Sequence, residues 1–573
     1  MLNIYNKQRR GFISVAFRQN STRKHENNIL KSVYKDLPVT NYTVNDFVWE
    51  NLDRWPDKTA TVCAITGHGY TYAQTHRMSV TFAAALRNKI KLQTNDKVAV
   101  ILPNVPEYPC TILGILQAGC IASMMNPIYS SEELKHQIQL INCKALVTSK
   151  ISYQNVRKAL SELKLDIPVI TTDNEILPGA VKFAELAEDF NIDTSCLKSV
   201  HRSPKDLAIL PFSSGTTGLP KAVVLTHQGV VALNQQIAYP EIVAIKETTA
   251  TYQPVLPAIL PFFHIFGFNA VMMNQMSMGA KLVTLPYFKP ELFLKTLVQY
   301  KADCLFLVPP MAIFLGKHPA VTPKHLETLY SIICGAAPLS ASDIEAVIAK
   351  NKNINFRQGY GLTETNGAVS IAKNLDVTHD SVGYVLASSE VKIVDLQTQE
   401  ALGPGQEGEL WYRGPNLMSG YYGDEEATKE VLTEDGWLKT GDIGRYDDNK
   451  YLYVTDRLKE LIKVKGFQVP PAELETVLRT HPKVLDCAVL GIPDPSSGEY
   501  PKAFIVTQQG VNLPEEEILD YVNSKVAVFK KVREVQFVKE IPKNAADQLL
   551  AWLASPRHAL ASPRFVIIRV YIR

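Results

Sequence analysis

Short apolar runs alternate with helical stretches along most of this chain, and this alternation restricts its fold more than any other feature. Residues 97–103, 144–148, 282–285, 304–308 and 331–334 are rich in Val, Ile, Leu, Phe or Ala and end at turn or polar residues. Runs of this length and composition are typical of buried strands. Buried strands separated by helices favour an α/β fold with largely parallel sheets.

The sequence changes character after Gly383. Residues 391–394 and 408–413 are short alternating strands with Gly and Pro in the turns between them, which indicates a small β-rich subdomain. A further unit opens near Asp456, with a helix at 471–479 that has Pro in its first turn, where the missing N–H is tolerated. The strands expected at 484–492 and 501–506 and the helix expected at 515–524 complete a small α+β domain.

Composition excludes several classes of protein. The chain has 573 residues and a formal net charge of +3, which is too close to neutral to suggest nucleic acid as the main partner. No two of the eight cysteines form a Cys-x-x-Cys pair, which argues against a zinc site. No uncharged run reaches the roughly 20 apolar residues of a membrane span, so no transmembrane segment is expected.

The first 31 residues form a separate compositional segment. No acidic residue precedes Glu26, whereas six Lys and Arg residues flank or follow the apolar stretch 11–17. Arginine and serine without acidic residues are typical of a mitochondrial transit peptide. We therefore expect a transit peptide in 1–31 and mitochondrial localisation, with a disordered basic tail as the alternative.

The strongest chemical signal is a loop rich in hydroxyl groups and glycine that follows the apolar run 207–212. Glycine lets a backbone approach an anion closely, hydroxyl groups donate to phosphate oxygens, and a lysine adds positive charge. The order of residues is not that of a Walker P-loop, because Ala222 follows the lysine. The predicted phosphate-binding residues are Ser213, Ser214, Gly215, Thr216, Thr217, Gly218 and Lys221.

This loop resembles the phosphate-binding loop of the adenylate-forming superfamily, which includes acyl-CoA synthetases, 4-coumarate–CoA ligases and beetle luciferases. The resemblance extends from about residue 39 to 545. It implies a large N-terminal lobe, 32–455, with two α/β sheet subdomains and a small β-barrel-like subdomain. It also implies a small mobile α+β C-terminal domain, 456–545.

Three further motifs resemble nucleotide-binding elements of the same superfamily. In 358–364 the resemblance assigns Gln358, Gly359 and Tyr360 to adenine, Thr363 to phosphate and Glu364 to Mg²⁺. A flat aromatic ring suits a base, and a carboxylate oxygen suits a hard cation. In 440–442 and 456–468 it assigns the following roles: ribose to Asp442 and Arg457, the adenylate to Lys459 and Lys463, and CoA to Lys465 and Gly466.

A fourth motif, 262–267, resembles the superfamily's acyl pocket. It places His264 beside the substrate carboxylate, and Ala336 would line the same pocket. The residues around both positions are apolar or small, so the acid is expected to have a hydrophobic tail, as in a fatty or 4-coumarate-like acid.

Together the resemblances imply an acid–CoA ligase that uses ATP, Mg²⁺ and CoA. The carboxylate attacks the α-phosphate to give acyl-AMP and diphosphate, and the CoA thiol then displaces AMP. A nucleotide- and acyl-binding pseudoenzyme is the main alternative, and a luciferase-like oxygenase is a lesser one. No carrier domain follows, which argues against a peptide-synthetase adenylation domain.

The C-terminal end departs from the superfamily, whose motif reads Pro-Lys-Asn-x-x-Gly-Lys. Here Asp547 stands at the glycine position and Gln548 at the lysine position. Because that lysine contacts the acyl phosphate in the family, we expect slow adenylation. Residues 546–573 show no family pattern, which suggests an alternative exon, a frameshift or a gene-prediction error. The chain has no final Ser-Lys-Leu; peroxisomal or cytosolic residence is the alternative to the mitochondrion.

Overall fold

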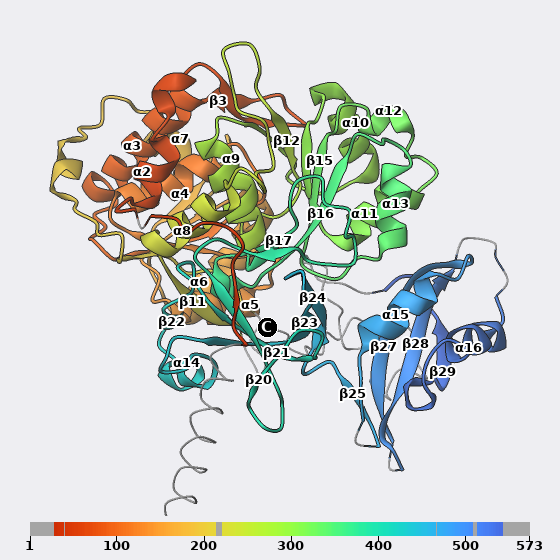
Figure 1. Cartoon of the computed structure of the whole chain (residues 1–573). Helices are drawn as coiled ribbons and strands as arrows, with labels where there is room; N and C mark the ends of the chain where they lie inside the picture. Colours follow the sequence, from red (N-terminus) through yellow and green to blue (C-terminus); the bar gives the residue numbers. More distant parts are fainter. Residues whose placement is uncertain are drawn as a thin grey trace, which may run out of the picture.

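A computed structural model describes residues 28–38, 40–213, 220–465, 467–494, 496–507, 511 and 513–541. Figure 1 shows a large lobe and, beside it, a smaller domain formed by the last part of the chain. The predicted N-terminal targeting segment up to residue 27 and the tail 546–573 lie outside the described residues. None of the described helices is both long and apolar enough to cross a membrane.

The first α/β subdomain is built on a nine-stranded sheet whose centre is parallel, as the sequence predicts. Its strands occur in the order β10 (Phe212–Ser213), β11 (Lys221–Thr226), β9 (Leu207–Ile209), β5 (Ile121–Met124), β4 (Lys97–Ile101), β6 (Ala145–Thr148), β7 (Val169–Thr171) and β8 (Val181–Lys182), and β22 (Gly420–Tyr421) pairs with β11.

Helices cover both faces of this sheet because successive residues of a strand point to opposite sides. In β4, Val98 and Val100 belong to the largest hydrophobic cluster, which includes α3 (Tyr72–Asn88) and α4 (Tyr108–Gln117). Their neighbours Ala99 and Ile101 belong to a different cluster with α5 (Ser131–Leu140) and α6 (Lys150–Leu163). Burial on both faces explains why these strands are continuously apolar in the sequence.

Two shorter sheets form the second α/β subdomain. One has the order β12 (Val255–Ala258), β13 (Lys281–Thr284), β2 (Thr59–Cys63) and β3 (Gly69–Thr71); the other has the order β14 (Cys304–Leu307), β15 (Ser331–Cys334), β16 (Asn355–Tyr360), β17 (Ser370–Ile371) and β18 (Tyr384–Val385). The backbone N–H of Asp303 donates to the carbonyl of Val255 at 2.9 Å, which joins the two sheets at β12 and β14.

Four helices pack on the β14–β16 side of this subdomain (Figure 1). They are α10 (Pro290–Tyr300), α11 (Pro309–Lys317), α12 (Pro323–Leu326) and α13 (Ala341–Ile348). Between the two α/β subdomains runs α8 (His227–Ile237), followed later by a π-helical segment, Phe266–Met273, and α9 (Asn274–Ser277).

The β-rich subdomain is an antiparallel sheet, as predicted. Its strands are β1 (Leu30–Lys31), β19 (Glu390–Val394), β21 (Gly408–Arg413), β23 (Leu438–Tyr446) and β24 (Leu452–Arg457), with β20 (Ala401–Leu402) paired to β19. Because Leu30 pairs with Val391, the folded lobe includes residues that the sequence places in the N-terminal tail. A two-residue strand has too little pattern to be recognised without its partner.

The C-terminal domain has its own hydrophobic core. Its sheet has the order β26 (Phe467–Val469), β25 (Ile462–Val464), β28 (Gly498–Thr507) and β27 (Val484–Asp494), and β29 (Glu534–Phe537) pairs in parallel with β28. Two helices, α15 (Pro471–Arg479) and α16 (Glu515–Asn523), pack against it and match the two predicted helices. Asp456 and Arg457 still belong to β24 of the lobe, so the chain leaves the lobe just after them.

Candidate active site

The phosphate loop joins the two strands of a hairpin. Ser213 at the end of β10 pairs with Lys221 at the start of β11, and the predicted loop residues Ser214, Gly215, Thr216, Thr217 and Gly218 lie outside the described residues. Ser213 is buried, and its Oγ has no hydrogen-bond partner among the described residues. The Lys221 ammonium lies 3.6 Å from a carboxylate oxygen of Asp424 and 5.2 Å from the ring centre of Tyr421. The hairpin thus brings a cation and a free hydroxyl to the base of the loop.

Glu364 lies in a single 3-10 turn, Thr363–Thr365, separated from the end of β16 by two residues. The turn ends at Asn366, whose φ of 55° is left-handed, a conformation that Asn tolerates better than most residues. Glu364 is only 4% exposed, and its Oε1 accepts a hydrogen bond from the Tyr421 hydroxyl at 2.9 Å. A buried carboxylate with a single fixed donor is suited to hold a cation through its other oxygen.

The predicted ribose-binding residues come together as expected. Asp442 on β23 and Arg457 on β24 are direct partners in the antiparallel pair, and Arg457 Nε lies 3.5 Å from Asp442 Oδ1. The other oxygen of Asp442 accepts a hydrogen bond from the Tyr360 hydroxyl at 2.5 Å. Burial raises the pKa of Asp442, while the charge of Arg457 opposes that rise. The trio presents a carboxylate that is oriented by two donors.

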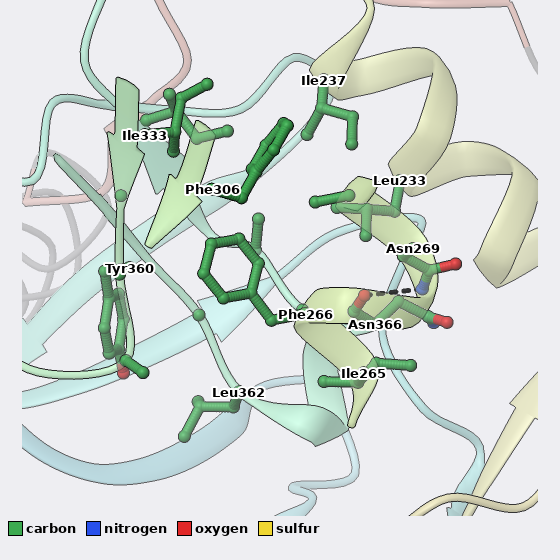
Figure 2. Close-up of a pocket in the computed structure, with 18 of the residues that line it drawn as sticks. Leu233, Ile237, Ile265, Phe266, Asn269, Phe306, Ile333, Tyr360, Leu362 and Asn366 are labelled. Atoms are coloured by element: carbon green, nitrogen blue, oxygen red, sulfur yellow. Dashed lines mark hydrogen bonds between the residues drawn. The ribbon is translucent and has the colours of Figure 1, made fainter. Parts of the chain in front are cut away.

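One pocket brings seven of the predicted site residues together. It is lined by Gly359, Tyr360, Thr363, Glu364, Arg457, His264 and Ala336. The same pocket continues between apolar side chains, as Figure 2 shows. These are Leu233, Ile237, Ile265, Phe266, Phe306 and Ile333. A polar region beside Glu364 is therefore continuous with an apolar one.

His264 is a neutral hydrogen-bond donor in this pocket. Its Nδ1 accepts the backbone N–H of Phe266 at 3.2 Å, so we assign the proton of the neutral ring to Nε2. Burial lowers the pKa of His264 to about 4, which keeps the ring uncharged at neutral pH. Ala336 lines the pocket with a φ of 77°, an unusual conformation for a residue other than glycine.

The structure separates Gln358 from the other residues of its motif. The side-chain amide of Gln358 bonds to both backbone groups of Leu339 at 3.2 Å and donates to the carbonyl of His379 at 2.5 Å. Gln358 is buried and does not line the pocket, whereas Gly359 and Tyr360 do. Its side chain therefore braces the backbone at Leu339 and His379, and its assignment to adenine stays a prediction.

The predicted lysines of the C-terminal domain lie outside the pocket. Lys459, Lys463 and Lys465 are exposed and do not line it, and Gly466 lies outside the described residues. Lys463 is in β25, where its backbone N–H donates to Glu499, and Lys465 has a φ of 49°. Their assignments to the adenylate and to CoA stay predictions.

Sequence reasoning missed the stretch 414–422, which packs against the Glu364 turn. Tyr421 donates to the Glu364 carboxylate, and the backbone N–H of Met418 donates to the Glu364 carbonyl at 2.8 Å. The segment has no distinctive composition, and it is more than 50 residues from Glu364 in sequence. Its place beside the site follows only from contacts in the fold, such as these bonds and the pairing of β22 with β11.

The chain is similar to known proteins over most of its length. The AMP-binding enzyme family matches residues 48–422, and the family of AMP-binding enzyme C-terminal domains matches residues 473–548. A 4-coumarate–CoA ligase of Arabidopsis thaliana is 34% identical over 94% of this chain and 97% of its own length. A probable 4-coumarate–CoA ligase of Dictyostelium discoideum is 36% identical over 91% and 96%.

Solved structures agree with the fold. ATP-bound MatB from Rhodopseudomonas palustris is 25% identical, with a TM-score of 0.79 over 89% of this chain and 97% of MatB. The anthranilate–CoA ligase AuaEII, in complex with anthranoyl-AMP, has a TM-score of 0.80 over 90% of this chain at 22% identity. The resemblance expected from the sequence is confirmed: the chain belongs to the AMP-binding enzyme family, among the AMP-forming acid–thiol ligases.

Proposed function

We propose that this chain converts a hydrophobic carboxylic acid, fatty or 4-coumarate-like, into its CoA thioester. One observation carries the proposal: the pocket lined by Glu364, Thr363 and His264 is also lined by a group of apolar side chains. An acid whose carboxylate lies at the polar end would bury its tail at the other. The names of the relatives from Arabidopsis and Dictyostelium support an acid of this class.

The reaction proceeds in two steps. A carboxylate oxygen attacks the α-phosphorus of ATP, the bond to the diphosphate breaks, and acyl-AMP forms. The sulfur of CoA, after loss of its proton, then attacks the acyl carbon, and AMP leaves with the bonding pair. The protein contributes by positioning the reactants and by offsetting charge on phosphoryl oxygens.

The residues in the pocket fit these needs. Asp442, held by Tyr360 and Arg457, can accept the ribose hydroxyls, and the Nε2–H of His264 can donate to a carboxylate. The hydroxyls and Lys221 of the loop would meet the phosphates. Lys463 serves adenylation and Lys465 thioester formation in this proposal, each after a rotation of the small domain.

Glu364 is the residue that would hold Mg²⁺. The described residues contain no group of three or more His, Cys, Asp and Glu side chains that could hold a metal by themselves. This fits Mg²⁺, which usually binds through one or two carboxylates together with substrate phosphates. When bound, the ion would neutralise charge on the phosphates.

Diphosphate release tests the proposal. Purified protein is incubated with ATP, Mg²⁺ and a panel of straight-chain and aromatic acids, with and without CoA. We expect diphosphate release with apolar acids and acyl-CoA formation only when CoA is present. Release with no acid of the panel, in a protein that still binds ATP, would favour a pseudoenzyme.

We also propose that residues 1–31 direct the protein to mitochondria, on the basis of their basic, acid-free composition. A fusion of this segment to a fluorescent reporter tests the proposal. Mitochondrial fluorescence is expected, and a cytosolic or peroxisomal signal would contradict it.

A further inference from the structure

The turn that carries Glu364 is held in part by Asn416, a residue from another part of the lobe. Asn416 Nδ2 donates to the carbonyl of Thr365 at 2.7 Å and to that of Ala368 at 2.8 Å. Asn416 is fully buried, so these bonds are shielded from water. One amide group therefore bridges two carbonyls on the C-terminal side of Glu364.

The turn also donates a hydrogen bond to the segment that contains Asn416. Asn366 Nδ2 donates to the backbone carbonyl of Asn416 at 2.8 Å. Asn366 is fully buried and has the left-handed φ of 55° that ends the turn. Asn416 thus donates to the turn at Thr365 and Ala368 and accepts a bond from Asn366, so hydrogen bonds run in both directions between the two segments.

Two more contacts from the same segment reach Glu364 itself. The backbone N–H of Met418 donates to the Glu364 carbonyl at 2.8 Å, and the Tyr421 hydroxyl donates to Oε1 at 2.9 Å. Both the backbone and the carboxylate of Glu364 are thus held by residues 416–421. Because Oε1 accepts the Tyr421 hydroxyl, the orientation of the carboxylate is fixed at one of its two oxygens.

The segment is itself rigidly anchored. The Tyr412 hydroxyl donates to Asn416 Oδ1 and lies 2.8 Å from Ser389 Oγ, to which Gln236 donates at 3.0 Å. A series of hydrogen bonds between buried side chains therefore links α8 to Asn416. On the other side, the backbone N–H of Ser419 donates to the carbonyl of Val224 at 3.0 Å. Hydrogen bonds shielded from water make this buried polar network rigid.

We infer that Asn416 and Tyr421 are positioning residues, which hold the Glu364 carboxylate in the orientation that binds nucleotide-bound Mg²⁺. The inference rests on the proposed function, because it takes Glu364 as the magnesium-binding residue. A purely structural role predicts only a loss of thermal stability. A positioning role predicts in addition a weaker response to Mg²⁺ at a temperature where the variant is folded.

Tyr421→Phe is the more direct test, because it removes the hydroxyl and keeps the ring over Lys221. Its matched control is Tyr72→Phe, which removes a buried hydroxyl that donates to the carbonyl of Ala280 at 2.7 Å, away from the pocket. We measure melting temperature, ATP affinity as a function of Mg²⁺ concentration, and diphosphate release. Tyr421→Phe is expected to raise the half-saturating Mg²⁺ concentration about tenfold, the size of effect typical of a lost bond to a charged group.

Asn416→Ala gives a second, independent test. Its control is Asn351→Ala, because Asn351 also bridges two carbonyls, those of Leu326 and Leu329, and also accepts one bond at its Oδ1. Both variants are expected to melt at a lower temperature, and only Asn416→Ala should require more Mg²⁺.

The outcomes separate this inference from the proposed function. If wild-type protein shows no Mg²⁺-dependent ATP binding, the proposed function fails. If the wild type binds Mg²⁺ and ATP, but Tyr421→Phe and Asn416→Ala require no more Mg²⁺ than their controls, only the positioning role is overturned.

Discussion

The carboxylate of Asp456 joins the lobe to the small domain: its Oδ2 accepts the backbone N–H of Ala472 at 3.2 Å. Ala472 lies in the first turn of α15, whereas Asp456 belongs to β24 of the lobe. The other oxygen accepts the backbone N–H of Arg457 at 2.7 Å. A lobe residue thus caps a helix of the small domain, where a negative charge is favoured by the helix dipole.

Burial nevertheless raises the pKa of Asp456 from 3.8 to about 7, and two nearby carboxylates, Glu460 and Glu475, act in the same direction. The folded protein therefore binds this proton more tightly than the unfolded chain does. Its contribution to stability is fully present below about pH 4 and is lost as the pH rises toward about 7. Replacement of Asp456 by Asn removes this pH-dependent contribution to stability.

The prediction is tested by melting temperatures from pH 5 to 8. The advantage of the wild type over Asp456→Asn should shrink as the pH rises. Asp166→Asn, at an exposed position, controls for the loss of one negative charge. A wild-type advantage that grows with pH would show that the charged form of Asp456 is the favoured one.

The lowered pKa of His264 predicts that its contribution to stability depends on pH in the opposite direction. Its pKa falls from 6.5 to about 4 through burial, so the unfolded chain binds this proton more tightly than the folded protein. The contribution of His264 to stability is present above pH 6.5 and is lost as the pH falls to about 4. The melting temperature of His264→Gln should therefore fall less on acidification than that of the wild type.

Activity gives a second readout for the same position. Gln can donate from its amide, as the Nε2–H of His264 does, whereas Leu cannot. We expect His264→Leu to lower kcat/KM for the acid by roughly tenfold or more, and His264→Gln to lower it less. Equal losses in the two variants would argue against a donor role for His264.

The bond between Tyr360 and Asp442 predicts a selective effect on ATP. Tyr360→Phe removes the donor that orients one carboxylate oxygen, while Arg457 still faces the other. A lost bond to a charged group is worth about 1.5–3 kcal/mol, so the KM for ATP should rise roughly tenfold or more. Steady-state kinetics with ATP and acid varied separately measure this. A similar rise in the KM for the acid would show a general disturbance of the pocket.

The fold was largely predictable because its strands are apolar on both faces and its helices have clear boundaries. The helix Pro471–Arg479 begins at a proline and ends before a polar turn, so its sequence prediction and structure coincide. By contrast, β1 has only two residues, and its existence depends on pairing with β19, more than 350 residues away. The local sequence pattern around residues 30–31 cannot indicate a strand partner so far away in the chain.

Some residues of the site could likewise be predicted from the sequence, and others could not. Asp442 and Arg457 could be predicted because short motifs carry them and the strand pair then aligns them. Tyr421 and Asn416 could not, because their residue types are ordinary and their roles arise only from contacts across the fold. The hydrogen bonds of the Gln358 amide with Leu339 and His379 could not be predicted either, because no motif reveals them.

The last prediction concerns Gln548, which lies outside the described residues although the C-terminal family match reaches it. An amide at the lysine position of the family motif supplies no positive charge to the acyl phosphate. Loss of one transition-state partner of this kind lowers the rate by roughly 10²–10³-fold. We therefore expect slow acyl-AMP formation but ordinary thioester formation from preformed acyl-AMP, and Gln548→Lys should accelerate only the first step.

The two steps are measured separately, as diphosphate release and as CoA consumption from synthetic acyl-AMP. Lys543→Ala tests whether the neighbouring lysine partly replaces the missing charge, in which case the first step slows further. Equal and ordinary rates of both steps in the wild type would mean that adenylation here does not need a cation at position 548. A Gln548→Lys variant that accelerates both steps would instead point to a general improvement in folding, because only the adenylating arrangement should use that charge.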